Sequence, residues 1–379
     1  MFFLIFSLII LSQNICSQER ILPGIYSTEE YFDDLENKKI ALVMNHSSLI
    51  ENKLLVDTLM KKNFNVIKIF TPEHGFKGNE DAGKLIKNSK YNENIIIISL
   101  YGNKKKPSKE DLYDVDIVVF DIQDVGVRFY TYISTLHYIM EACAENNKKL
   151  IILDRPNPNG FYIDGPILEY KYKSFVGMHP VPIVYGMTIG EYALMINGEE
   201  WLTNKIKCNL KIVKCKNYTH DSIYIPPVPP SPNLKNIHSI LLYPTIGLFE
   251  GTIMSVGRGT TLPFEIIGHP NFYDRSFCFI PQPTTGATNP PYKGRKCYGI
   301  DLRNCDFYKE KKLNITLIIE VYHKMKQHNF FNEYFNLLAG TDKLKKQIMN
   351  GLNEEEIRKS WQNDIENFKK IREKYLLYK

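Results

Sequence analysis

Several familiar signatures are missing from this 379-residue chain, and each absence excludes a class of protein. No G-x-G-x-x-G, G-x-x-x-x-G-K-[ST], G-x-S-x-G or H-E-x-x-H occurs. A dinucleotide enzyme, a P-loop nucleotide binder and a nucleophile-elbow hydrolase are therefore disfavoured. No cysteine pair has the C-x-x-C spacing, and no apolar run is long enough for a multi-span membrane protein.

A strong excess of one charge is also absent. Lys and Arg number 48 and Asp and Glu 42, which gives a net charge of +6. This mild balance permits an anionic substrate, but a nucleic-acid partner requires concentrated positive charge and is not expected. The lysine run at residues 104–106 precedes a proline and has no interleaved aromatics, so we predict a solvated loop there. The length favours two domains.

The longest apolar run covers residues 2–11 at the N-terminus. It is too short to span a bilayer, which takes about twenty residues, and it fits the apolar region of a signal peptide. We therefore predict a signal peptide at residues 1–17, a secreted or periplasmic location and no stable membrane insertion. Lipidation of Cys16 is an alternative, although residues 13–15 make a poor lipobox.

Six cysteines follow this segment. In an oxidising compartment Cys208 and Cys215, or Cys297 and Cys305, are the candidate pairs.

Short β-branched runs alternate with amphipathic stretches between residues 39 and 155. Strands are expected at residues 40–44, 65–70, 95–100, 116–120 and 149–153, and helices at 52–62, 108–113 and 131–146. The strands are apolar on both faces, which is typical of a parallel sheet covered by helices.

The sequence pattern changes after about residue 204, where proline-rich turns separate weaker predicted strands. Helical patterns return at residues 313–328 and from 344 to the end, where we predict one charged helix. The fold prediction is α/β, with a Rossmann-like parallel-sheet domain at residues 18–203 and a smaller α+β domain at 204–379.

Polar side chains follow each of the five predicted strands. In open α/β sheets ligands bind beyond the carboxyl ends of the strands, so these loops predict an active site on one rim. Because the usual motifs are absent, catalysis by carboxyl groups is the kind of chemistry that remains for this site. The candidate carboxylates are Glu73, Asp121, Asp124 and, from the second half, Glu250.

Glu73 lies between Pro72 and the His74-Gly75 dipeptide on a tight turn, which fixes its direction. A carboxyl confined in this way suits a general acid, whereas the alternative is a surface residue that caps the turn. Asp121 directly follows an apolar strand. It is a candidate second carboxylate or hydroxyl binder, or else it forms an ion pair with Arg128 or Arg155.

Glycines adjoin both Glu250 and Arg258, which allows the backbone to approach a ligand closely. Arg258 is a candidate to bind a carboxylate through two parallel hydrogen bonds. The alternative is that it stabilises its own loop. A metal set formed by His46, His74, Asp121 and Asp154 lacks helical spacing, so we expect no metal and no cofactor.

Taken together and in this order, a series of short motifs resembles the NamZ-type exo-β-N-acetylmuramidases, a family once known as a domain of unknown function. The resemblance covers essentially the whole chain after the signal peptide. The motifs are PEHG (72–75), FDIQDVGVRFYTY (120–132), LDRPNPNG (153–160), YGMTIGE (185–191), PPSPN (229–233), LFEGT (248–252), GRGT (257–260), LAGTD (338–342) and YLLY (375–378).

The resemblance implies an enzyme that removes N-acetylmuramic acid from the non-reducing ends of peptidoglycan fragments by cleaving the β-1,4 link to N-acetylglucosamine. It also implies an active site between a Rossmann-like domain and a smaller domain. The family's proposed catalytic glutamate corresponds to Glu73, whereas the second catalytic group is not carried over.

We expect a saccharide substrate with a lactyl carboxylate, which Arg128 or Arg258 would bind. Tyr101, Tyr130 and Tyr132 would pack on sugar faces. His74 and Asp124 are further candidate contacts, and Asn157 either binds sugar or caps a helix.

Two other functions compete with this interpretation. One is a metal-dependent or ester hydrolase on the same rim. The other is a non-catalytic cell-wall protein that holds muropeptides in the cleft.

Overall fold

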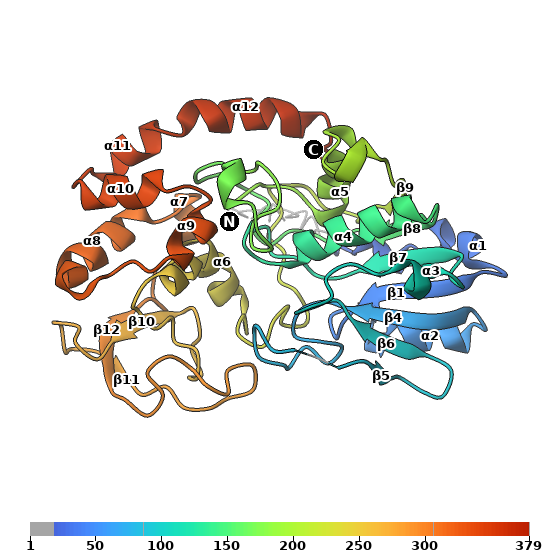
Figure 1. The fold of residues 1–379 in the computed structure, drawn as a ribbon, viewed down its shortest axis with the longest axis horizontal. Helices are drawn as coiled ribbons and strands as arrows, with labels where there is room; N and C mark the ends of the chain where they lie inside the picture. The colour runs from blue at the N-terminus through green and yellow to red at the C-terminus, as the bar shows by residue number, and fades with distance from the viewer. Residues whose placement is uncertain (1–18, 86, 306, 379) are drawn as a thin grey trace, which may run out of the picture.

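The protein consists of two lobes that lie side by side, as the computed structural model shows (Figure 1). The structure describes residues 19–85, 87–305 and 307–378. The predicted signal peptide and Cys16 lie outside these residues. Within the described ranges, no helix has the length and apolar character needed to cross a membrane.

The first lobe is built on a seven-stranded sheet with the order β5-β6-β4-β1-β7-β8-β9. All neighbouring pairs are parallel except β5 with β6. This confirms the predicted α/β class. The strands are β1 (Lys39–Met44), β4 (Asn65–Thr71), β5 (Ser89–Lys90), β6 (Ile96–Ser99), β7 (Ile117–Asp121), β8 (Lys149–Leu153) and β9 (Asn209–Val213).

Alternating side chains of each central strand enter two separate cores, because successive residues of a strand point to opposite faces. In β1, Ala41 and Val43 belong to the core that also contains residues of helices α4 and α5. Ile40, Leu42 and Met44 belong to the core that contains residues of α1 and α2. The sheet is therefore buried on both faces, which is the reason its strands read as continuous apolar runs.

The helices of the first lobe cover these two faces. Two of them begin with a capping box, in which Ser108 or Thr188 receives a backbone N–H three residues later. The helices are α1 (Phe32–Leu35), α2 (Leu55–Lys61), α3 (Lys109–Leu112), α4 (Tyr132–Glu145) and α5 (Ile189–Gly198). A small hairpin is formed by β2 (Leu49–Ile50) and β3 (Lys53–Leu54).

The second lobe combines helices with a small antiparallel sheet in the order β10-β12-β11. The strands are β10 (Ile266–His269), β11 (Cys278–Phe279) and β12 (Cys297–Asp301). The helices are α6 (Ile237–Ile246), α7 (Phe307–Glu310), α8 (Ile315–Met325), α9 (Tyr334–Ala339), α10 (Lys343–Met349), α11 (Glu354–Lys359) and α12 (Gln362–Glu373).

Two details differ from the sequence-based expectation. The large sheet continues beyond residue 203, where the domain boundary was expected, because β9 pairs with β8. The prediction of a single C-terminal helix is wrong, because residues 343–373 form the three helices α10, α11 and α12. Gly351 has φ +80°, a left-handed conformation that ends a helix, and Asn353 caps the next one.

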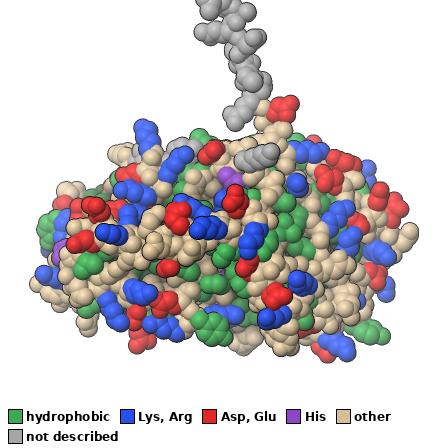
Figure 2. Space-filling model, turned by 90° about the horizontal axis from the view of Figure 1, so that it is seen from above, with side chains coloured by type: hydrophobic (Ala, Val, Ile, Leu, Met, Phe, Trp, Pro, Cys, Tyr) green, Lys and Arg blue, Asp and Glu red, His purple; other side chains and the backbone are tan. Residues whose placement is uncertain are grey.

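The C-terminal helices return the chain to the first lobe. Helix α12 crosses the top of the view and the C-terminus lies beside α5 (Figure 1). On this upper face, acidic and basic side chains are intermingled (Figure 2).

Candidate active site

A cavity of about 450 Å³ lies between the lobes, at the carboxyl ends of β4, β6 and β7. This is the position that the rule for open α/β sheets predicts. Loops of the first lobe form one side, and α6, α9 and two loops of the second lobe form the other. The lining side chains are Glu73, His74, Tyr101, Lys105, Phe129, Tyr130, Thr131, Phe175, Val176, Ser231, Leu234, Tyr243, Glu250, Arg258, Phe264 and Tyr334.

Glu73 follows the end of β4 and is held from two sides. Its Oε2 accepts a hydrogen bond of 2.7 Å from the Thr131 hydroxyl, and its Oε1 accepts one of 3.2 Å from the Gly83 backbone N–H. Next to it, His74 and Gly75 have φ values of +69° and +72°. A left-handed conformation at a histidine is strained and persists only where the surroundings enforce it. The tight turn predicted from the sequence is therefore present.

His74 joins the turn to the second lobe. Its Nδ1 lies 2.7 Å from the Glu80 carbonyl and must donate the proton, so Nε2 accepts from the Ser231 hydroxyl at 3.3 Å. Burial lowers the pKa of His74, with the Glu73 carboxylate opposing this effect. His74 is thus a neutral side chain that positions the loop carrying Glu73.

Tyr101 lies beside Glu73 in the cavity wall. The pKa of Tyr101 is raised mainly by burial and, to a smaller extent, by the negative charge of Glu73. The phenol therefore stays protonated and can donate a hydrogen bond. Tyr130 also lines the cavity, with its hydroxyl donating to the Pro230 carbonyl at 2.9 Å. Tyr132, in contrast, is buried at 1% exposure and does not line the cavity.

Glu250 and Arg258 bring the second lobe into the site. Arg258 Nε donates to Glu250 Oε1 at 2.7 Å, and the guanidinium lies 4.9 Å from the centre of the Phe264 ring. The Nη1 atom of Arg258 is buried and has no hydrogen-bond partner in the described structure. The pair therefore presents one carboxylate and one incompletely used guanidinium to the cavity.

The glycines beside this pair pack against protein and not against a ligand site. A Cβ atom on Gly251 would lie 2.3 Å from the Cα of Phe335, and one on Gly259 would lie 2.6 Å from the Gln282 carbonyl oxygen. The sequence suggested that the backbone approaches a ligand here, whereas these two glycines instead allow close contacts inside the second lobe.

Four predicted site residues lie outside the cavity lining. Asp121 is fully buried and receives two hydrogen bonds from Arg155, of 2.6 Å from Nε and 2.8 Å from Nη2. The ion-pair alternative for Asp121 is therefore the one that the structure contains. Asp124 accepts hydrogen bonds from the Gly126 N–H at 2.7 Å and from the Tyr185 hydroxyl. Burial raises the pKa of Asp124 to about 6.

Arg128 and Asn157 serve the scaffold as well. Arg128 is fully buried and donates to three backbone carbonyls at 2.7–2.9 Å, those of Pro166, Val181 and Leu338. It thus joins the first lobe to the second. Asn157 is 3% exposed and donates to the Met187 carbonyl at 2.8 Å.

Several lining residues were not anticipated from the sequence. Lys105 belongs to the run that was predicted to be a solvated loop, yet it lines the cavity. Thr131 and Ser231 fall inside the family motifs and could have been noticed there. Phe175 and Tyr334 carry no signal in the sequence, because they reach the site only through the approach of distant loops.

The cysteine pairs proposed from the sequence do not form. All six cysteines from Cys143 onward are free, so neither Cys208–Cys215 nor Cys297–Cys305 is a disulfide. Among the described residues, no group of three or more His, Cys, Asp or Glu side chains is arranged to hold a metal ion.

Comparison with known proteins places this chain in a family. Residues 40–238 match a family model described as exo-β-N-acetylmuramidase NamZ, N-terminal, and residues 241–378 match the corresponding C-terminal model. The chain belongs to the NamZ family.

Two kinds of relatives support this membership. Peptidoglycan β-N-acetylmuramidase NamZ of Bacillus subtilis (strain 168) is 39% identical over 373 residues, which cover 92% of this chain and 89% of that protein. Two crystal structures of DUF1343 family proteins from Bacteroides fragilis NCTC 9343 are also similar. Their identities are 47% and 31% and their TM-scores 0.87 and 0.81, and each comparison covers 95% of this chain and 99% of the other.

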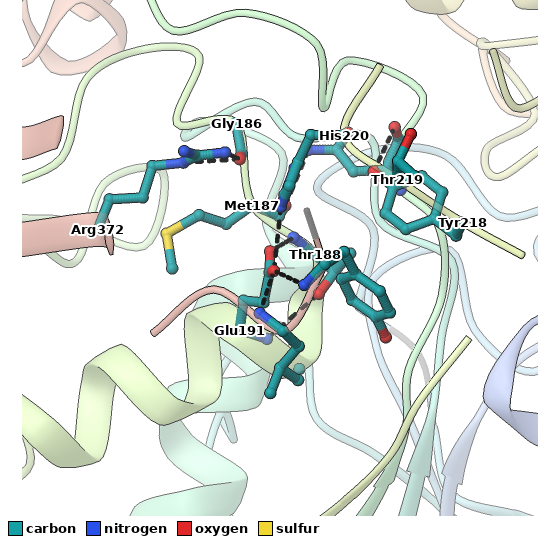
Figure 3. Close-up of polar contacts among 12 residues, drawn as sticks. Gly186, Met187, Thr188, Glu191, Tyr218, Thr219, His220 and Arg372 are labelled. Atoms are coloured by element: carbon teal, nitrogen blue, oxygen red, sulfur yellow. Dashed lines mark hydrogen bonds and ion pairs between the residues drawn. The ribbon is translucent and has the colours of Figure 1, made fainter. Parts of the chain in front are cut away.

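Some motifs shared with the NamZ family are structural. Residues 185–191 end at Glu191, a fully buried carboxylate that receives the Thr188 N–H at 2.9 Å and lies 3.0 Å from His220 Nε2 (Figure 3). The same carboxylate accepts the backbone N–H of Leu377 at 2.8 Å. Nearby, Arg372 of α12 donates to the Gly186 carbonyl at 2.9 Å (Figure 3). This motif therefore fastens the C-terminal tail to the first lobe, away from the cavity.

Proposed function

We propose that this protein is an exo-acting glycoside hydrolase that releases N-acetylmuramic acid from the non-reducing ends of peptidoglycan fragments. The bond cleaved is the β-1,4 link to N-acetylglucosamine. The observation that carries the proposal is that Glu73 and Glu250, from opposite lobes, line one cavity in a chain of the NamZ family. Glycosidases commonly act with two carboxyl groups that flank the scissile bond.

In this mechanism Glu73 is the general acid that protonates the leaving oxygen. Thr131 and the Gly83 N–H fix the direction of its carboxyl group, and Tyr101 supplies a further polar contact beside it. Pre-positioning of this kind lowers the barrier, because the acid need not reorganise when the bond breaks.

Glu250 is the second carboxylate, which supports the positive charge that develops on the sugar or the attack of water. Arg258 donates to Glu250 Oε1 at 2.7 Å, which leaves Oε2 available for a contact with the substrate. Aromatic side chains supply flat apolar surface for sugar rings. They are Tyr101, Phe129, Tyr130, Phe175, Tyr243, Phe264 and Tyr334.

The test is incubation of the purified protein with the disaccharide MurNAc-GlcNAc, with released sugars followed by mass spectrometry. We expect free MurNAc and GlcNAc in equal amounts, both with and without a chelator. Loss of release in the chelator would favour the metal-dependent hydrolase. Binding of the disaccharide without release, by folded protein, would favour the non-catalytic binding protein.

We also propose that the protein acts outside the cytoplasmic membrane. The apolar segment at residues 2–11 and the cell-wall substrate support this location. Fractionation of cells that express the full chain, with mass determination of the mature N-terminus, tests it. An intact N-terminus in the cytoplasmic fraction would contradict it, and a lipid adduct on Cys16 would identify a lipoprotein.

A further inference from the structure

Lys105 is the middle residue of a three-lysine run, and only its neighbours are used in ion pairs. Lys104 lies 2.5 Å from an Asp111 oxygen, and Lys106 lies 2.8 Å from a Glu141 oxygen. Lys105 lines the active-site cavity and forms no ion pair within the part of the chain that the structure describes. The two outer lysines therefore anchor the loop, while the middle one faces the site.

The surroundings of Lys105 hold its ammonium group without neutralising it. Nζ lies 4.7 Å from the centre of the Phe175 ring, a cation–π arrangement. Phe175 is fixed in turn, since its carbonyl accepts a 2.7 Å hydrogen bond from Ser134 and its ring stacks on Tyr138 with an interplanar angle of 18°. The ring of Tyr101 lies 5.9 Å from that of Phe175. Lys105 therefore lies against a cavity wall whose aromatic side chains are already held in place by their neighbours.

The two other basic side chains that line the cavity carry no unpaired positive charge. Arg258 pairs with Glu250, and burial lowers the pKa of His74, so that this imidazole is neutral near pH 7. Lys105 is therefore the one cation among the described lining residues that has no anionic protein partner. A partly buried cation without a partner is a candidate to bind an anion of the substrate.

This step rests on the proposed function. N-acetylmuramic acid carries a single carboxylate, on its lactyl ether, and N-acetylglucosamine carries none. We propose that Lys105 binds this lactyl carboxylate and makes the enzyme selective for muramic acid over glucosamine termini. Arg258, which the sequence had suggested for this contact, instead orients Glu250.

The experiment compares three 4-nitrophenyl β-glycosides: that of N-acetylmuramic acid, that of its lactyl methyl ester and that of N-acetylglucosamine. Lys105→Met is expected to lower kcat/KM for the acid by about tenfold to hundredfold, the scale of a charge-assisted hydrogen bond. It should leave the two uncharged substrates nearly unchanged. Lys105→Arg should retain most of the preference for the acid. Lys109→Met, an exposed lysine of α3, is the matched control and should change nothing.

A second measurement needs no turnover. Calorimetric titration of the wild type and of Lys105→Met with free N-acetylmuramic acid and with its methyl ester reports the carboxylate contact directly. If Lys105→Met lowers activity on all three glycosides equally, or on none, the inference about Lys105 is overturned while the glycosidase function stands. If the wild type cleaves neither these glycosides nor MurNAc-GlcNAc but binds the acid through Lys105, the proposed function fails, while the contact between Lys105 and the lactyl carboxylate stands.

Discussion

Arg258 of the second lobe donates to Glu250 at 2.7 Å inside the cavity that Glu73 lines from the first lobe. The two candidate catalytic carboxylates are therefore supported differently. Glu73 is held by neutral donors, a hydroxyl and a backbone N–H, whereas Glu250 is held by a cation. This difference suits two carboxyl groups with distinct tasks in one reaction.

Replacement of Glu73 by Gln is expected to lower kcat by roughly a hundredfold or more, because the amide cannot deliver a proton to the leaving oxygen. Glu110→Gln, an exposed carboxyl of α3, serves as the control. Steady-state kinetics on MurNAc-GlcNAc measures the effect, and circular dichroism checks the fold. A folded Glu73→Gln enzyme with near-normal turnover would rule out the acid role.

The Glu250–Arg258 pair is expected to act as a unit. Glu250→Gln and Arg258→Ala should each reduce kcat by about tenfold to hundredfold, because each removes a charged hydrogen-bond partner from the site. The double variant should be little worse than the poorer single variant, since the shared contact is already lost. Kinetics of the four enzymes on one substrate gives the coupling. Fully additive losses would show that the two residues work independently.

Arg128 should prove important for stability and not for substrate choice. Arg128→Met leaves three buried carbonyls without their donor, so the free energy of unfolding should fall by about 3 kcal/mol or more. Urea denaturation measures this, with the half-exposed Arg303→Met as control. The ratio of kcat/KM between muramic acid and glucosamine glycosides should not change. A collapse of that ratio would restore Arg128 as a lactyl contact.

Asp124 should give the folded state a distinct pH dependence. Burial raises its pKa to about 6 in the folded protein, against about 4 in the unfolded chain. The folded state therefore binds the proton more tightly than the unfolded chain does. The resulting contribution to the free energy of unfolding is complete below pH 4 and is lost as the pH rises through 6. It amounts to about 3 kcal/mol.

In Asp124→Asn that component is missing. The stability difference, wild type minus variant, should therefore decrease between pH 4 and pH 7 in urea denaturation experiments. A difference that is constant over this range would show that the carboxyl group does not titrate as described.

The large sheet was predictable from the sequence for a physical reason. Each of its central strands is buried on both faces, so an unbroken apolar run marks the strand without ambiguity, as in residues 40–44 and 149–153. The same logic fails for the polar residues that follow. A residue just past a strand can face the cavity, as Glu73 does, or turn into the protein, as Asp121 does toward Arg155. Sequence spacing does not distinguish the two directions.

The remaining site residues depend on tertiary approach. Phe175 and Tyr334 lie 159 positions apart in the sequence, and neither follows a sheet strand, yet both line the cavity. The break of the C-terminal helix at Gly351 was readable in principle, since an Asn-Gly pair often ends a helix. The strong helical pattern on both sides obscured it.

The last residues of the chain do more than complete a helix. Tyr378 donates to the buried Asp154 at 2.6 Å and accepts the Cys215 N–H at 2.9 Å, while Leu377 binds Glu191. This tail therefore attaches the second lobe to the first in addition to the proline-rich linker and the contact of Arg128 with Leu338. A body attached at several places cannot rotate freely about any one of them. We therefore expect the cavity to keep its width when substrate is absent, and we expect the loss of Tyr378 to loosen the active site although Tyr378 does not line it.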